Sequence, residues 1–180
     1  MTNKIPVLVG ELVRLRPIND ADHLSWFEVE QDESMHKWVG NAVPTSLDEV
    51  KHALYELYPQ HFMLWMIEEK TSGKVIGMMR ISHPEQRGNQ LVAGDSQRLH
   101  SDYWRKGYMR ESRKLIYDYV FNTLKIDVLY ADVWEGNVNS IKSLVSAGYK
   151  LIDCRKEYFK KYNKTQNKLY YELREATWKR

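Results

Sequence analysis

The sequence predicts a mixed α/β fold built on a mainly antiparallel sheet of about six to seven strands, flanked by about four helices. Segments with strand periodicity and segments with helical periodicity follow one another as strand, two helices, three strands, helix, strand, helix and two strands. The segments Leu91–Leu99 and Val128–Trp134 are joined by a long helix, and such a crossover pairs two strands in parallel. With 180 residues and no repeat or linker, the chain is expected to form one domain, residues 1–180.

The N-terminal segment begins with a strand and a helix. Glu11–Arg16 alternates polar and apolar residues and stops at Pro17, which is typical of a strand. Asn19 or Asp20 can cap a helix that runs through Phe27. The buried face of this helix is expected to contain Leu24, Trp26 and Phe27.

A second helix follows a loop over Gln31–Pro44. Ser46–Glu49 has the pattern of a capping box, in which the side chains of the first and fourth residues each bond the other's main-chain N–H. Apolar residues then recur at helical spacing at Val50, Ala53, Leu54 and Leu57. Pro59 is expected to close this helix.

The middle of the chain predicts a hairpin and then the strand of the crossover. Phe62–Ile67 and Val75–Ile81 are rich in strand formers and are separated by a turn at Thr71–Gly73. His83–Gln90 is expected to be a loop before the strand at Leu91–Leu99. Gly94 inside that strand indicates a bulge or a close approach of another main chain.

The C-terminal part alternates helices and strands. Leu115, Ile116 and Tyr119 lie on one face of a helix that continues to about Leu124. The strand Val128–Trp134 is followed by a short helix, a glycine stop and two more strands. These last elements are expected at Ser140–Ala147, Gly148, Tyr149–Cys154 and Lys168–Arg174.

Composition excludes several classes of protein. A hydrophobic share of 43% and a charged share of 28% are typical of a soluble globular protein. A net charge of +3 is far below that of a dedicated nucleic-acid coat, and a pI near 8.8 suits an acidic small-molecule ligand equally well.

Cysteine, histidine and hydropathy patterns indicate a cytoplasmic protein without a metal site or a membrane span. A single cysteine, Cys154, cannot form an intramolecular disulfide, and it is either a nucleophile or a small apolar strand residue. No histidine pair has ligand spacing. No apolar stretch approaches the ~20 residues of a membrane span, and Met1–Gly10 lacks the features of a signal peptide.

A candidate anion site lies where the crossover helix begins. Arg105, Lys106 and Gly107 occupy a short loop between the strand at Leu91–Leu99 and the helix. Unpaired N–H groups and the positive end of the helix dipole attract anions at such a junction, and a phosphate is the expected ligand. An ordinary basic loop that caps a helix would look the same.

Two motifs add a resemblance to a known family. Tyr103–Met109 looks like the pyrophosphate loop of the GNAT N-acetyltransferases, and Asn137–Ile141 followed by Ala147–Tyr149 looks like their second cofactor motif. The chain resembles the RimJ/RimL type in particular, from Leu12 to Arg174. It departs from the family pattern at two loop positions. Arg105 stands where glycine is usual, and Met109 stands where glycine or alanine is usual.

The resemblance implies an acetyl-CoA site in which the two parallel strands splay apart around the pantetheine arm. Main-chain groups of Arg98, Leu99 and His100 would pair with this arm, and N–H groups from Arg105 to Met109 would hold the pyrophosphate. Asn137 would bond the pantetheine, although it or Asn139 could instead cap the helix. The implied cofactor-binding residues are Arg98, Leu99, His100, Arg105, Lys106, Gly107, Tyr108, Met109, Asn137 and Ser140.

The resemblance also implies catalytic roles in acetyl transfer to an amine. The N–H of Leu99 or a neighbour would stabilise the developing oxyanion. Ser140 would protonate the leaving thiolate, or its hydroxyl would satisfy a main-chain N–H at the start of the helix. Many relatives carry a glutamate as general base at the position that Gly94 occupies here, so the neighbouring Asp95 is the candidate general base. The alternative is that Asp95 is a solvated strand residue.

The expected activity is acetyl-CoA-dependent N-acetylation of a primary amine, either a protein N-terminal α-amine or a small molecule, by direct transfer. The loops Gln31–Pro44 and His83–Gln90 are expected to select the acceptor. The protein is expected to be a monomer or a homodimer. Arg155–Lys168 interleaves lysines with aromatic residues and predicts either RNA, ribosome or acidic-partner binding or a long solvated hairpin connection. A non-catalytic acyl-CoA sensor is a further alternative.

Overall fold

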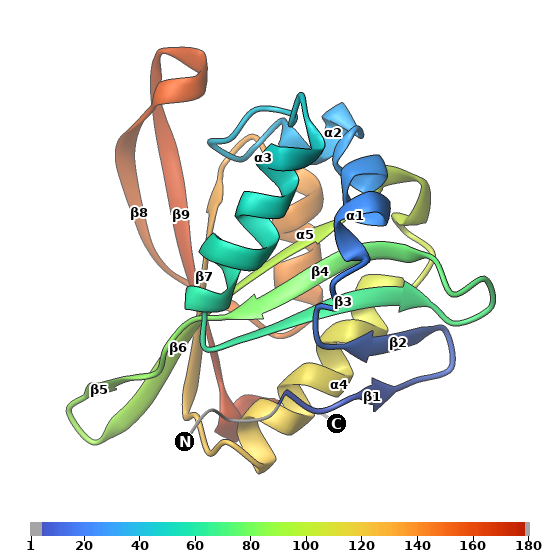
Figure 1. The fold of residues 1–180 in the computed structure, drawn as a ribbon. Helices are drawn as coiled ribbons and strands as arrows, with labels where there is room; N and C mark the ends of the chain where they lie inside the picture. Colours follow the sequence, from blue (N-terminus) through green and yellow to red (C-terminus); the bar gives the residue numbers. More distant parts are fainter. Residues whose placement is uncertain (1–4, 179–180) are drawn as a thin grey trace.

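The computed structural model describes residues 5–178, which form a nine-stranded sheet in the order β1-β2-β3-β4-β6-β7-β9-β8, with β5 paired to β6 (Figure 1). Its strands are β1 (Leu8–Val9), β2 (Val13–Arg16), β3 (Met63–Glu69), β4 (Val75–Ile81), β5 (Glu85–Arg87), β6 (Gln90–Leu99), β7 (Val128–Trp134), β8 (Lys150–Phe159) and β9 (Lys164–Arg174). Among the strands of residues 5–178, only β6 and β7 pair in parallel, which confirms the predicted mixed fold.

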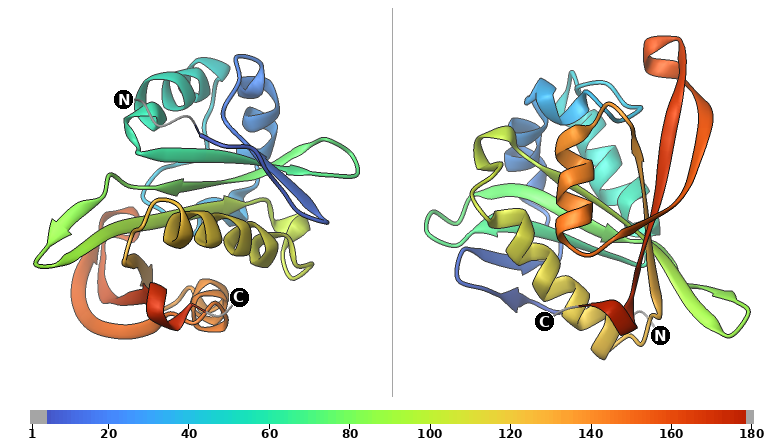
Figure 2. Two further views of the ribbon diagram at one scale, coloured as in Figure 1. Left: turned by 90° about the horizontal axis from the view of Figure 1, so that it is seen from below. Right: turned by 180° about the vertical axis from the view of Figure 1, so that it is seen from behind.

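Helices cover both faces of the sheet. The α-helices are α1 (Asp22–Glu30), α2 (Glu33–His36), α3 (Leu47–His52), α4 (Tyr108–Asn122) and α5 (Val138–Ser146). Figures 1 and 2 show α1 and α3 on one face and α4 and α5 on the other. The strand β3 is therefore buried on both sides, because Leu64 and Met66 pack under α1 and α3 while Trp65 and Ile67 belong to the core that includes α4.

The first two helices differ from the prediction at their ends. α1 starts at Asp22, and its N-cap residue, Ala21, makes no side-chain cap hydrogen bond. Leu24, expected on the buried face, is 54% exposed. In α3, Ser46 caps the N–H of Glu49, but the Glu49 carboxylate bonds Thr45 and does not complete the capping box. The chain then continues beyond α3 through π turns at Ala53–Leu57 and a 3-10 turn at Tyr58–Gln60, so Pro59 does not end the helical segment.

Two segments that were expected to be loops are hairpin strands. β5 lies within the predicted loop His83–Gln90 and pairs with the start of β6. Arg155–Lys168 is the outer half of the β8–β9 hairpin, which turns at Lys160–Tyr162. At this tip, the Tyr162 hydroxyl donates to Lys37 O at 2.6 Å and Lys161 Nζ donates to Asn41 O at 3.1 Å.

None of the helices within residues 5–178 is long and apolar enough to cross a membrane.

Candidate active site

The parallel strands β6 and β7 separate part of the way along their length. They pair only from Val92↔Val128 to Gly94↔Tyr130. Beyond this point β6 remains paired with β4, through Leu99↔Gly77, and β7 remains paired with β9, through Trp134↔Lys168. A gap therefore opens in the sheet between the ends of β6 and β7.

The pairing of β6 with β4 decides which main-chain groups face this gap. His100 N donates to Ile76 O and Ser82 N donates to Gly94 O, both at 2.9 Å, so the even-numbered residues of this segment direct their main-chain groups to β4. Because strand residues alternate, the main-chain groups of Gln97 and Leu99 face the gap. The expectation that Arg98 and His100 offer main-chain groups to a ligand in the gap is therefore wrong, and Gln97 takes their place beside Leu99.

A row of free main-chain N–H groups marks the start of α4. The N–H groups of Arg105 to Arg110 have no acceptor among residues 5–178. Arg105 has φ +60° and Gly107, the N-cap, has φ +93°. Left-handed residues in such a turn direct successive N–H groups to one side, where the positive end of the α4 dipole adds to their field. The loop therefore forms a cradle with the geometry to hold an anion.

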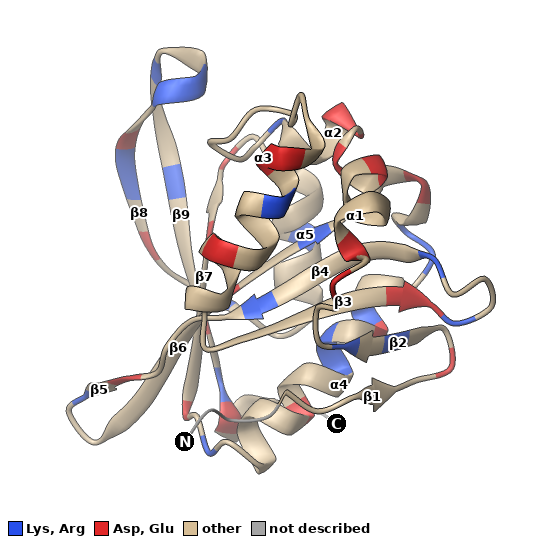
Figure 3. Cartoon of the chain, viewed as in Figure 1, with Lys and Arg blue, Asp and Glu red and all other residues tan. Residues whose placement is uncertain are grey.

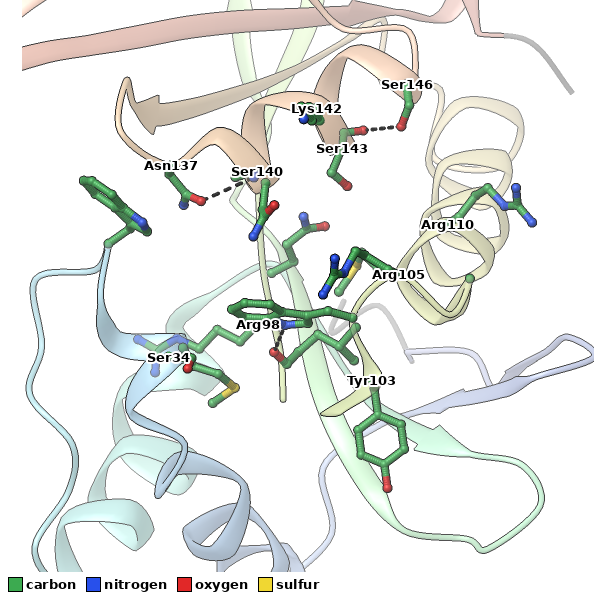
Figure 4. A pocket seen from close by; sticks show the side chains of 18 of the residues that line it. Ser34, Arg98, Tyr103, Arg105, Arg110, Asn137, Ser140, Lys142, Ser143 and Ser146 are labelled. Atoms are coloured by element: carbon green, nitrogen blue, oxygen red, sulfur yellow. Dashed lines mark hydrogen bonds between the residues drawn. The ribbon is translucent and has the colours of Figure 1, made fainter. Parts of the chain in front are cut away.

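The cradle and the gap open into one cleft of about 640 Å³ between α2, α4 and α5 (Figure 4). Arg105 extends into the cleft, whereas the Tyr103 ring points away from its centre (Figure 4). Of the predicted cofactor-binding residues, those that line it are Arg98, Leu99, Arg105, Gly107, Met109, Asn137 and Ser140. The cleft is thus bordered by the ends of both predicted motifs.

Asn137 and Ser140 divide the two roles that the sequence left open. Asn137 is the N-cap of α5, and its Oδ1 accepts from the N–H of Ser140 at 3.3 Å (Figure 4). The Ser140 hydroxyl has no hydrogen-bond partner among residues 5–178, so it does not cap the helix and stays available on the wall of the cleft.

The family model for the Acetyltransferase (GNAT) domain matches residues 13–150. The chain belongs to the GNAT acetyltransferase family. Solved structures support the same fold. A GCN5-related N-acetyltransferase from Brucella melitensis superposes with a TM-score of 0.84 at 17% identity, over 99% of this chain and 82% of that one.

Two further solved structures are similar to this chain to a comparable degree. The acetyltransferase (GNAT family) from Bacillus anthracis gives a TM-score of 0.81 at 15% identity, over 95% of this chain and 99% of that chain. The ribosomal-protein-S5-alanine acetyltransferase from Vibrio fischeri gives 0.80 at 19% identity, over 97% of this chain and all of that one (100%).

Asp95, the candidate base, lies on the side of the GNAT sheet that faces α4. Its carboxylate accepts from the Tyr117 hydroxyl, which in turn accepts from the Tyr149 hydroxyl at 3.2 Å. Desolvation raises the pKa of Asp95 against the opposing charge of Arg113. The Asp95 carboxylate is therefore held within the core by two tyrosines and is not presented to an incoming amine.

Three other predicted residues also lie outside the cleft lining. The Tyr108 hydroxyl turns away and donates to Glu69 Oε1 at 2.6 Å. His100 places its ring against Tyr103, and Lys106 offers only its main-chain N–H to the cradle.

Two tryptophans line this GNAT cleft. Trp104 Nε1 donates to Leu99 O at 2.7 Å, so one carbonyl at the gap is already bonded while the Leu99 N–H is not. Trp38 closes the top of the cleft over Gly136, where an added Cβ would lie 2.1 Å from the indole. The only sequence signal for this contact is the glycine itself, between β7 and α5.

Sequence reasoning missed Arg113, a buried cation on α4 that links β6 to α5. Its Nε donates to Gln97 Oε1 at 2.9 Å and its Nη1 donates to Ser143 O at 2.8 Å. Arg113 therefore fixes the distance between β6 and α5. Nothing in the periodicity of α4 distinguishes this arginine from a solvent-exposed one.

Proposed function

We propose that this GNAT acetyltransferase transfers an acetyl group from acetyl-CoA directly to a primary amine, as in the RimJ/RimL type, with a protein N-terminal α-amine or a small-molecule amine as acceptor. The observation that carries the proposal is the row of free N–H groups at Arg105–Arg110, set at the mouth of a cleft that ends at the β6–β7 gap. A diphosphate supplies the negative oxygens that these donors lack.

The residues at the site suit a CoA thioester. The cradle would hold the diphosphate, aided by the charge of Arg105, and main-chain groups of Gln97 would pair with the amide-bearing arm. Acetyl-CoA, when bound, supplies an acyl group activated as a thioester. The Leu99 N–H faces the gap and would stabilise the negative charge that develops on the thioester oxygen. The free Ser140 hydroxyl would give its proton to the leaving sulfur.

The choice of acceptor rests on the chemistry of amines. Only a neutral amine attacks a carbonyl, and an α-amine has a pKa near ~8 whereas lysine has one near ~10.4. An α-amine therefore needs a weaker base, which favours it over an internal lysine. The Vibrio fischeri structure, named as an enzyme that acts on the alanine of ribosomal protein S5, supports the same class of acceptor.

The competing proposal of RNA or ribosome binding has less support. Figure 3 shows basic residues at the tip of the β8–β9 hairpin. However, Lys161 Nζ and the Tyr162 hydroxyl already donate to main-chain carbonyls of the loop after α2, so these two polar groups are used within the chain.

The test measures thiol released from acetyl-CoA with a panel of N-terminal peptides, polyamines, amino acids and aminoglycosides, alongside calorimetry with CoA. We expect CoA to bind and at least one amine to release thiol, and mass spectrometry of the product to locate the acetyl group. CoA binding with no thiol release from any amine would instead indicate an acyl-CoA sensor. Acetylation of internal lysines alone would contradict the choice of acceptor.

A further inference from the structure

Asp132 on β7 lies beside the gap, on the sheet face opposite α4. Its neighbours Ala131 and Val133 are buried in the core that contains α4, so alternation along the strand places Asp132 on the other face. The Asp132 side chain is 52% exposed. Continuing the Gly94↔Tyr130 register by two residues puts Asp132 across the gap from Ser96.

The cofactor cleft reaches this same face. Arg98 lies two residues beyond Ser96 on β6, on the same face, and it lines the cleft. Gln97, between them, directs its main-chain groups into the gap. A thioester in the gap would thus be open, on the side away from α4, to a reactant that approaches along Asp132.

The surroundings of Asp132 already hold a primary ammonium group. Lys168 Nζ lies 2.8 Å from Asp132 Oδ2 and 3.8 Å from a Glu157 carboxylate oxygen. The same Nζ sits 5.3 Å from the ring centre of Trp134 and 5.8 Å from that of Tyr170. The other oxygen, Asp132 Oδ1, has no hydrogen-bond partner among residues 5–178.

We propose that Asp132 binds the acceptor's ammonium group through Oδ1 and acts as the general base of acetyl transfer, and that Lys168 is a positioning residue that holds the carboxylate. This rests on the proposed function. The ammonium group gives one proton to Asp132, and the freed electron pair forms the C–N bond as the C–S bond breaks. Ser140 gives its proton to the sulfur, which leaves as the CoA thiol, and the nitrogen's second proton restores the serine hydroxyl. One net proton then passes from Asp132 to water.

Charged and titratable groups face Asp132 from β8 and β9. Burial lowers the pKa of Lys168, but the hydrogen bond and the charge of Asp132 outweigh this effect and raise it, so Lys168 stays cationic while an acceptor is bound. Tyr170 on β9 donates to Glu157 on β8. The groups that face Asp132 are Lys168 and Tyr170 from β9 and Glu157 from β8, with Arg155 stacked on Tyr170. Asp95 on β6 lies on the opposite face of the sheet, toward α4, and acts on Asp132 only as a like charge.

The experiment compares kcat/KM against pH for the full chain and for D132N, K168M and E172Q, with an α-amine peptide identified in the panel. Glu172 is a matched control on the same face of β9, but it pairs with Tyr130, where β6 and β7 have not yet separated. At pH 7 we expect D132N to lose at least about 100-fold in kcat/KM and to bind CoA as the parent does. E172Q should retain the parent rate.

The pH profile separates a base from a structural residue. The parent should reach a plateau below the pKa of the amine, whereas D132N should gain about tenfold per pH unit up to that pKa, near ~8, because only pre-formed neutral amine reacts. K168M should lower kcat/KM because Asp132 loses the group that holds its carboxylate, whereas K168R, which keeps a hydrogen-bonding cation at this position, should restore most of the rate.

Each outcome decides between the claims. A D132N rate close to the parent's, a constant D132N deficit at every pH, or a loss of CoA binding in D132N would overturn the role of Asp132 and leave acetyl transfer standing. A parent enzyme that transfers acetyl to no amine would overturn the proposed function, and this inference with it.

Discussion

Replacing Gly107 with alanine tests the anion cradle directly. Gly107 has φ +93°, and holding an L-residue in the left-handed region costs roughly 1–2 kcal/mol. An added Cβ would meet Leu12 Cδ1 at 3.3 Å and Arg110 Nη2 at 3.9 Å, which are ends of flexible side chains. The cost is therefore conformational, and it must appear either in stability or in CoA affinity.

Because the loop before α4 is exposed, we expect its main chain to relax in G107A. The variant should therefore lose affinity for CoA and keep its stability. The dissociation constant for CoA in calorimetry should rise by about 5- to 30-fold, which corresponds to roughly 1–2 kcal/mol. The matched control is G88A, since Gly88 has φ +59° in the β5–β6 turn with nothing within 4 Å of an added Cβ.

G88A has the same kind of strain at a distance from the cleft. It should lower the melting temperature by roughly 2–8 °C and leave CoA affinity unchanged. If G107A bound CoA within twofold of the parent, or if G88A weakened CoA equally, the cradle would not be the diphosphate site.

Four other substitutions give separate predictions. S140A should lower kcat by about 100-fold or more with unchanged CoA affinity, and equal rates would exclude a proton donor at this position. N137A should cost about 1 kcal/mol in urea unfolding, because α5 loses its cap. Burial, with the nearby charge of Arg98, lowers the pKa of His36 in the folded chain. Acidification below ~6.5 therefore protonates this histidine in the unfolded chain first and lowers the free energy of unfolding. H36Q should reduce the dependence of the free energy of unfolding on pH between pH 7.5 and 5.5. D95N should unfold less readily than the parent at pH 8, because the raised pKa makes ionised Asp95 unfavourable in the fold, while transfer should continue.

The crossover and both loop motifs were predictable because their signals are local. Gly107 stands at the left-handed N-cap of α4, and Asn137 stands three residues before the N–H that it caps. The helical spacing of α4 and the continuous apolar run of β7 likewise depend on neighbouring residues. Strands β1 and β5, with two and three residues, are too short to show a period.

The direction of groups around the gap was not predictable, because it depends on pairing between distant segments. Whether Leu99 and Gln97, or Arg98 and His100, face the gap is set by the register of β6 against β4, and a shift of one residue would reverse it. Asp95 faces α4 for the same reason. Glu111 gives another long-range case, since its carboxylate accepts from main-chain N–H groups of Leu12 and Val13, nearly one hundred residues away in sequence.

The strength of the base and the nature of the acceptor are linked. A carboxylate is a weaker base than an amine, and each unit by which the amine's pKa exceeds that of its base makes deprotonation about 1.4 kcal/mol harder. An α-amine near ~8 is therefore within reach of such a base at roughly 3 kcal/mol less than a lysine near ~10.4. The penalty of D132N should follow the same scale and be larger for polyamines than for N-terminal peptides. If D132N lost the same rate with both acceptors, base strength would not explain the choice of acceptor. That choice would then depend on contacts with the loop after α2 and with the β8–β9 hairpin.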